Sequence, residues 1–140
     1  MAFTFHKSER LCSKNIIEQL FIKGSRGFSQ FPFRFSWVPI HLDSPSPVQV
    51  LIVVSKRNFP KAHQRNQVKR QIRELYRLNK SALYDTMPNG KQCALMVSYI
   101  AKEKILYHDL SKTFRQAIIR LSNELQKTDQ DAIHPADKNL

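Results

Sequence analysis

The chain has few glycines, few cysteines and few acidic residues, and each shortage excludes a class of protein. Three glycines and seven prolines in 140 residues exclude a collagen-like or low-complexity chain. Cys12 and Cys93 lie far apart and match no metal-ligand spacing, so we expect reduced thiols rather than a disulfide or zinc site. The longest apolar run, VLIVV at 50–54, is too short for a membrane span or a signal sequence. We therefore expect a cytoplasmic protein without a membrane partner.

The shortage of acids leaves a large positive charge. Lys and Arg number 23 against 11 Asp and Glu, which gives a formal net charge of +12 at pH 7. Hydrophobic residues make up 41% of the chain, a proportion that is ordinary for a folded protein. An excess of positive charge of this size destabilises the compact state through self-repulsion, and it usually indicates a polyanionic partner.

Hydrophobic periodicity indicates an α+β domain. The pattern predicts a helix at 13–24, strands at 31–38, 48–56 and 93–100, and helices at 62–79 and 109–125. Ser13 is the expected N-cap of the first helix, and Gly24 its C-terminal stop. Strand 48–56 is apolar on both faces, which favours a central position in the sheet. Apolar content falls sharply late in the chain, so we expect a single domain at 1–126 and a loose C-terminal tail at 127–140.

Four aromatic residues alternate along the first expected strand and share one of its faces: Phe31, Phe33, Phe35 and Trp37. Such a stripe belongs either to the core or to a platform on which nucleobases stack, and the sequence leaves both interpretations open. Pro32 favours an edge position or the start of a strand, because proline cannot donate to a sheet.

The expected helix at 62–79 is strongly basic. Arg65, Lys69, Arg73 and Arg77 recur at every fourth position and gather on one face, beside a narrow apolar stripe that would pack on the sheet. Nine cations and one acid fall within 56–80. Like charges four residues apart each cost a helix about 0.2–0.5 kcal/mol, so another interaction must offset this arrangement.

Three partners could face these cations: solvent, a membrane surface or phosphate groups. A solvated face would interleave acids with the cations, and a membrane-surface helix would carry larger apolar and aromatic residues. Arginine predominates, and its planar fork suits phosphate oxygens and guanine edges. Asn66 lies among the cations, where it could bind a base, a sugar or a hydrated metal, or make only a local bond. The pattern favours phosphate binding.

The segment SKRNFPKAHQRNQVKRQIRELYR at 55–77 resembles the signature of the bacterial ribonuclease P protein subunit. The matching residues are Ser55, Lys56, Arg57, Ala62, Arg65, Asn66, Lys69, Arg70, Arg73, Glu74 and Arg77. A weaker resemblance extends over about 3–125. It implies an α-β sandwich with a small four-stranded sheet and three helices in the order αβββαβα. The family also has a left-handed βαβ crossover, like domain 2 of ribosomal protein S5.

The resemblance implies a role in a ribonucleoprotein enzyme. In that family the catalyst is an RNA, and the protein binds both this RNA and the 5′ leader of precursor tRNA. The particle hydrolyses one phosphodiester to leave a 5′-phosphate on mature tRNA, with Mg²⁺ bound mainly by the RNA. It implies no catalytic residue or metal site in the protein and no obligate protein partner.

The resemblance also assigns two groups of binding residues. Contacts to the catalytic RNA are expected from Lys56, Arg57, Lys61, Arg65, Asn66, Lys69, Arg70, Arg73 and Arg77. A cleft for the leader is expected between the first helix and the open sheet face, lined by Ile17, Phe21, Phe33, Phe35 and Tyr99.

Three positions depart from the family pattern. Gln67 replaces the second arginine of an Arg-Asn-Arg triplet, at an angle away from the cationic face, so we expect little loss of RNA binding. Phe59-Pro60 replaces a glycine in the loop before the helix. Tyr99 stands where many relatives have arginine, which puts one contact to a leader phosphate in doubt.

Other functions compete with this interpretation. The main alternative is a noncatalytic RNA-binding or ribosome-assembly module that uses the same helix. A DNA-binding helix would need a helix-turn-helix companion, and a strand precedes this helix instead. A protein nuclease would need clustered carboxylates, whereas the acids and the five histidines are scattered along the chain.

Overall fold

The computed structural model describes residues 7–22, 26–87 and 90–132. Within these ranges a short 3-10 turn, η1, precedes three α-helices and one four-stranded sheet. The elements are η1 (Lys7–Glu9), α1 (Lys14–Ile22), β1 (Arg26–Gln30), β2 (Phe33–Pro39), β3 (Val48–Val54), α2 (Ala62–Tyr84), β4 (Cys93–Tyr99) and α3 (Tyr107–Ala132). The predicted α+β class and the order αβββαβα are confirmed.

The sheet is mixed, with strand order β1-β2-β4-β3. β2 is antiparallel to both β1 and β4, whereas β3 and β4 are parallel and α2 connects them. The predicted central position of the strand at 48–56 is wrong, because β3 lies at an edge of the sheet. It is apolar on both faces because helices cover both. The N-terminal segment also lies along this edge, where the Leu11 amide donates to the Val50 carbonyl at 3.0 Å.

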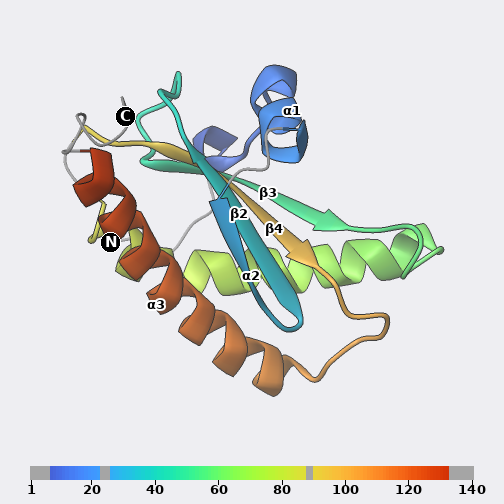
Figure 1. Ribbon diagram of the computed structural model, residues 1–140. Coiled ribbons are helices and arrows are strands. Elements are labelled where there is room, and N and C mark those ends of the chain that lie inside the picture. The colour runs from blue at the N-terminus through green and yellow to red at the C-terminus, as the bar shows by residue number, and fades with distance from the viewer. Residues whose placement is uncertain (1–6, 23–25, 88–89, 133–140) are drawn as a thin grey trace.

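Strand alternation divides the apolar residues between the two faces of the sheet. Odd-numbered residues of β2 and β4 and even-numbered residues of β3 pack with α2 and α3 in the main core, whereas the alternate residues of these strands face α1 in a smaller cluster. Figure 1 shows α1 on one side of the sheet and the two long helices on the other. The aromatic stripe belongs to the core, since Phe33, Phe35 and Trp37 are buried. Phe31 lies outside the strand and is exposed.

The sequence pattern missed β1. Its residues, RGFSQ, are mostly polar and show no clear alternation, and its conformation depends on pairing with β2. Gly27 permits this close pairing, because a Cβ there would lie 2.6 Å from the Phe35 carbonyl oxygen. Pro32 immediately precedes β2, which agrees with its predicted position at the start of a strand.

The helix boundaries agree with the prediction at the start of α1 and differ from it at the ends of α2 and α3. The Ile16 amide donates to the Ser13 hydroxyl at 3.4 Å, which confirms the N-cap of α1. Gly24, its predicted stop, lies outside the described residues. The predicted ends at 79 and 125 are too early, because α2 continues to Tyr84 and α3 to Ala132. Residues 133–140 of the predicted tail lie outside the described residues. No helix in the described ranges is long and apolar enough to cross a membrane.

Candidate nucleic-acid interface

α2 keeps one side in the core and presents its cations on the other. Val68, Ile72 and Leu75 are almost fully buried, and they form the predicted apolar stripe. Asn66 and Arg70 are exposed, whereas Arg65, Lys69, Arg73 and Arg77 are half-buried.

A hollow of about 240 Å³ lies beside this helix, at the β3 edge. Arg10 from the N-terminal segment lines it together with Lys69 and Arg73 of α2. Burial lowers the pKa of Arg73, and the nearby guanidinium groups of Arg10 and Arg70 lower it further. Within the described residues no carboxylate pairs with Lys69, Arg70 or Arg73. Crowded cations of this kind form a surface that an anion would stabilise.

Arg65 serves the fold as well as the surface. Its Nη1 donates to the carbonyl oxygens of Phe59 and Pro60, both at 2.9 Å, and so fixes the loop before α2. Phe59 itself is buried in the core. The departure at 59–60 from the family pattern therefore supplies an anchor for this loop. Lys56, Arg57 and Lys61 are exposed in it.

Arg77 is paired with an acid. Its Nε donates to Oε1 of Glu74 at 3.0 Å, and Nη2 contacts the other carboxylate oxygen. The hydrogen bond from Arg77 lowers the pKa of Glu74, so the carboxylate stays ionised. Because the pair has no net charge, Arg77 adds less to the positive surface than the sequence suggested.

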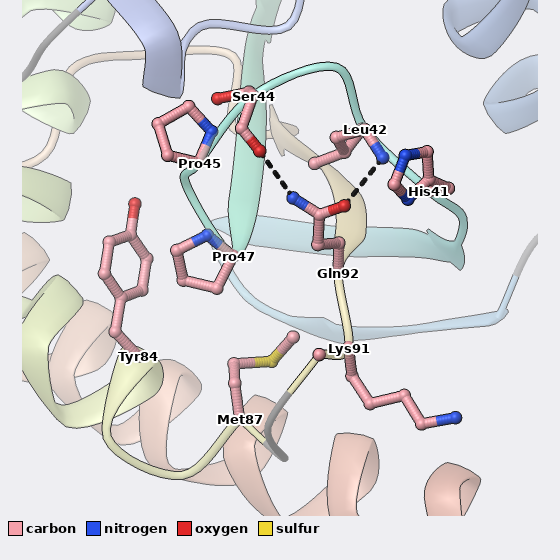
Figure 2. A pocket seen from close by; sticks show the side chains of 10 residues that line it. His41, Leu42, Ser44, Pro45, Pro47, Tyr84, Met87, Lys91 and Gln92 are labelled. Carbon is pink, nitrogen blue, oxygen red and sulfur yellow. Dashed lines mark hydrogen bonds between the residues drawn. The ribbon is translucent and has the colours of Figure 1, made fainter.

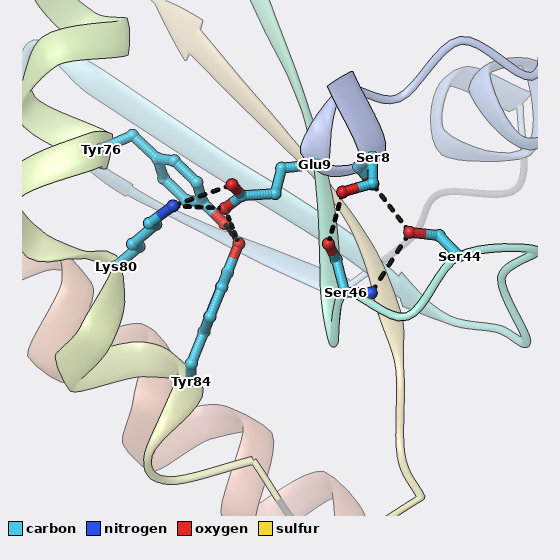
Figure 3. Close-up of polar contacts among 7 residues, drawn as sticks. All are labelled: Ser8, Glu9, Ser44, Ser46, Tyr76, Lys80 and Tyr84. Atoms are coloured by element: carbon cyan, nitrogen blue, oxygen red, sulfur yellow. Dashed lines mark hydrogen bonds and ion pairs between the residues drawn. The ribbon is translucent and has the colours of Figure 1, made fainter. Parts of the chain in front are cut away.

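Lys80 is the last of the nine cations in 56–80, and at about 100° per residue its direction lies within roughly 20° of that of Lys69, which would place it on the cationic face. The structure buries it together with Glu9, whose two oxygens accept from the Lys80 ammonium at 2.8 Å each. The Tyr84 hydroxyl also donates to Glu9, at 2.6 Å (Figure 3). The angle was right, but the N-terminal segment covers that part of the helix.

The predicted leader-binding residues separate into two groups. Phe33, Phe35 and Tyr99 expose 0, 0 and 2% of their surface and lie on the α2–α3 side of the sheet, so their assignment to a cleft beside α1 is wrong. They are odd-numbered strand residues, and alternation turns them away from α1. Ile17 packs half-buried in the α1 cluster, and Phe21 is 60% exposed.

The alternate residues of these strands occupy the α1 side instead, and the sequence analysis did not assign them to the leader cleft. Arg34 of β2 lies opposite Ser98 of β4, which in turn lies opposite Val53 of β3. Arg34 is exposed and the other two are half-buried. The alternation that placed the aromatic stripe on one face could have placed these three on the other.

A second hollow, of about 470 Å³, lies at the opposite end of α2 (Figure 2). Gln92 organises its wall, since its Nε2 donates to the Ser44 carbonyl at 2.7 Å and its Oε1 accepts from the Leu42 amide at 2.8 Å. The predicted RNA-binding residues do not line it. Across the described ranges, no three His, Cys, Asp or Glu side chains lie close enough together to hold a metal ion.

Comparison with known proteins identifies the family. The family model for Ribonuclease P matches residues 5–122. The ribonuclease P protein component of Porphyromonas gingivalis strain W83 is 30% identical over 127 residues, covering 88% of this chain and 90% of that protein. The component from Chlorobium phaeobacteroides is 32% identical over 131 residues and covers 88% of each.

Solved structures share the fold. The RNase P protein from Thermotoga maritima is 22% identical with a TM-score of 0.62, covering 80% of this chain and 96% of that one. The Staphylococcus aureus RNase P protein is 18% identical with a TM-score of 0.59, covering 83% and 96%. The resemblance at 55–77 thus extends to the architecture, and the chain belongs to the Ribonuclease P family.

Proposed function

We propose that this chain is the ribonuclease P subunit that docks on the catalytic RNA through α2 and binds the 5′ leader of precursor tRNA. In doing so it supports the endonucleolytic cut that releases the leader and leaves a 5′-phosphate on mature tRNA. The observation that carries the proposal is the group of Lys69, Arg70 and Arg73, which lies beside Arg10 and is paired with no carboxylate in the described residues. Such a surface suits a phosphate backbone.

Different residues would supply different parts of the RNA contact. Lys69 and Arg73 line a hollow that can receive a backbone phosphate, whereas Arg70 and Asn66 project to solvent from the same helix. Lys56, Arg57 and Lys61 would extend the contact from the loop at the N-terminal end of α2. Arg65 would hold that loop in place.

The leader would bind on the α1 side of the sheet. Phe21 exposes most of its ring near the end of α1, where a base can stack on it. Arg34, Ser98 and Val53 keep exposed surface on neighbouring strands, and Arg34 can contact a leader phosphate. These residues replace Phe33, Phe35 and Tyr99 in the proposal.

The chemistry is assigned to the RNA subunit. The described residues include no carboxylate and histidine cluster that fits a metal centre, so we derive no metal-dependent step in this chain. Mg²⁺ held mainly by the RNA would activate the water for phosphodiester hydrolysis. The particle would work in the cytoplasm, where precursor tRNA is processed, without an obligate protein partner.

Reconstitution tests the proposal. The purified chain is mixed with its own ribonuclease P RNA, and 5′ cleavage of precursor tRNA is followed at low Mg²⁺ concentration. We expect cleavage that requires both components and is absent with the protein alone. If the chain binds RNA but never stimulates its own ribonuclease P RNA, the noncatalytic RNA-binding or ribosome-assembly module becomes the better interpretation.

A further inference from the structure

The loop between β4 and α3, residues 100–106, brings another cation to the surface of α2. The Lys104 ammonium donates a hydrogen bond to the Gln67 side-chain oxygen, and both residues are exposed. Gln67 directly follows Asn66, so the ammonium is held at the N-terminal half of the helix. The sequence separates these two residues by 37 positions, and no helical pattern could pair them.

This loop is fixed to the domain on both sides of Lys104. The Ile100 amide donates to the Pro32 carbonyl at 2.8 Å, and the Tyr99 hydroxyl donates to the Glu103 carbonyl at 2.8 Å. Ile105 then packs against the main core. The backbone of Lys104 is therefore held between two anchors, which reduces the entropy lost when its side chain binds a partner.

Gln67 and the hollow lie on different borders of the exposed surface of α2. At about 100° per residue, Gln67 lies roughly 160° from Lys69 around the helix axis. Arg10 adds a cation on the border near β3, and Lys104 adds one on the border near α3. Both borders thus carry a cation from another segment, and together they widen the positive surface beyond the helix itself.

The chemistry of the contact leaves this charge available. Gln67 offers a neutral amide oxygen, which orients the ammonium without neutralising it. A carboxylate at this position would form an ion pair with no net charge, as Glu74 does with Arg77. A single exposed hydrogen bond adds little to stability, so its main effect is to determine where the charge lies.

We propose that Lys104 is a phosphate-contacting residue of the RNA-docking surface and that Gln67 is its positioning residue. The proposal rests on the proposed function, in which α2 docks on an RNA. It assigns a binding role to the β4–α3 loop, and it makes Gln67 a residue that recruits a charge from elsewhere in the fold.

The test measures binding of the full-length chain to its ribonuclease P RNA over a range of salt concentrations. The variants are Lys104→Ala, Gln67→Ala and their combination, with Lys112→Ala as control, because Lys112 is an exposed lysine of α3 and removes the same charge. We expect Lys104→Ala to reduce the slope of log K against log salt by about 0.7–0.9, the value for one lost phosphate contact. Lys112→Ala should leave the slope near that of the unmodified chain.

Two comparisons, one of which needs a further variant, separate positioning from a general effect on the fold. Gln67→Ala should weaken binding in the unmodified chain and have no further effect in Lys104→Ala. Gln67→Lys combined with Lys104→Ala should restore most of the lost slope, because it returns a cation to the same place. If Lys104→Ala matches Lys112→Ala in slope and affinity, the role of Lys104 is overturned while docking through α2 stands. If the unmodified chain shows no salt-dependent RNA binding, the proposed function fails as well.

Discussion

The Glu9 carboxylate is enclosed by side chains from a distant part of the chain. Lys80 and Tyr84 donate to it, and the Tyr84 hydroxyl also lies 3.1 Å from that of Tyr76. Glu9 and Lys80 expose 3% and 9% of their surface, so water contributes little to their solvation. The charged groups stabilise each other, and the pair ties η1 to the C-terminal half of α2.

Removing one partner of this pair should therefore be costly. We expect Lys80→Ala to lower the free energy of unfolding by about 3 kcal/mol, because it leaves a buried carboxylate without its cation. Urea denaturation measures the change, and Lys69→Ala serves as a half-buried control with no ion pair. Replacing both partners, as Glu9→Gln with Lys80→Met, should cost less than Lys80→Ala. A loss below about 1 kcal/mol in Lys80→Ala would show that the pair is solvated.

The two cysteines should differ in reactivity. Burial raises the pKa of the Cys93 thiol to about 12, from a usual value near 9, whereas Cys12 is exposed. The folded state keeps Cys93 protonated, so its contribution to stability is complete below pH 9 and is lost as the pH rises toward 12. We expect iodoacetamide at pH 8 to modify Cys12 in the folded protein and Cys93 only after unfolding, as measured by mass spectrometry. Equal rates of labelling in the folded protein would contradict the burial of Cys93.

At the scale of elements, α2 divides into two halves with different roles. Its C-terminal half is held by the Glu9 pair and by the buried Leu83. Its N-terminal half carries Lys69, Arg70 and Arg73, which pair with no carboxylate in the described part of the chain, and it meets both the hollow and the β4–α3 loop. A rigid helix anchored at one end can present charges at the other with fixed spacing, as phosphate recognition requires.

The cations of the N-terminal half should act through phosphate. We expect Lys69→Ala with Arg73→Ala to flatten the dependence of log K on log salt by about 0.7–0.9 per lost contact, in titrations with ribonuclease P RNA. Lys112→Ala with Arg115→Ala removes the same charge from exposed positions of α3 and should have a smaller effect. An unchanged slope in a folded Lys69/Arg73 variant would count against phosphate contacts at these positions.

The end of α1 should distinguish precursor from mature tRNA. We expect Phe21→Ala to weaken holoenzyme binding of precursor tRNA by about 1–3 kcal/mol, the usual contribution of one stacked base, with little effect on mature tRNA. Because Phe21 is 60% exposed, its loss should leave stability nearly unchanged. Ile119→Ala, at a similarly exposed position of α3, is the matched control. Equal losses with both tRNAs would show that Phe21 does not contact the leader.

At the scale of the whole molecule, the residues with strong periodicity were the most predictable from sequence. β3, β4 and α2 begin within two residues of their predicted starts, because long apolar patterns determine them. The cationic side of α2 also follows from sequence spacing. The position of β1 could not be predicted in this way, since its conformation depends on pairing with β2 rather than on its own residues.

Contacts between distant segments account for the remaining differences. A helical angle gives the direction of Lys80, but it does not show that Glu9, 71 positions away, covers that direction. The edge position of β3 and the link from Lys104 to Gln67 depend likewise on tertiary arrangement. Sequence patterns therefore predicted the basic helix, and the structure was needed to show which of its cations remain at the surface.

The net charge of +12 should make the free protein sensitive to salt. We expect the free energy of unfolding to rise as NaCl increases from about 0.02 to 0.2 M, because screening weakens the repulsion among cations such as Arg10 and Arg73. Urea denaturation at each salt concentration measures this. A fall in stability over the same range would indicate that attractive ion pairs outweigh the repulsion.

The contact of the N-terminal segment with β3 has a consequence for the behaviour of the protein in solution. An apolar edge strand with unpaired backbone groups is a template for adding a strand from another molecule. The bond from the Leu11 amide to Val50 occupies part of that edge, and the Glu9 pair holds the segment in place. Shortening the chain before residue 12 would remove this cover and expose β3 to intermolecular strand pairing, so the segment at 7–11 also protects the protein against aggregation.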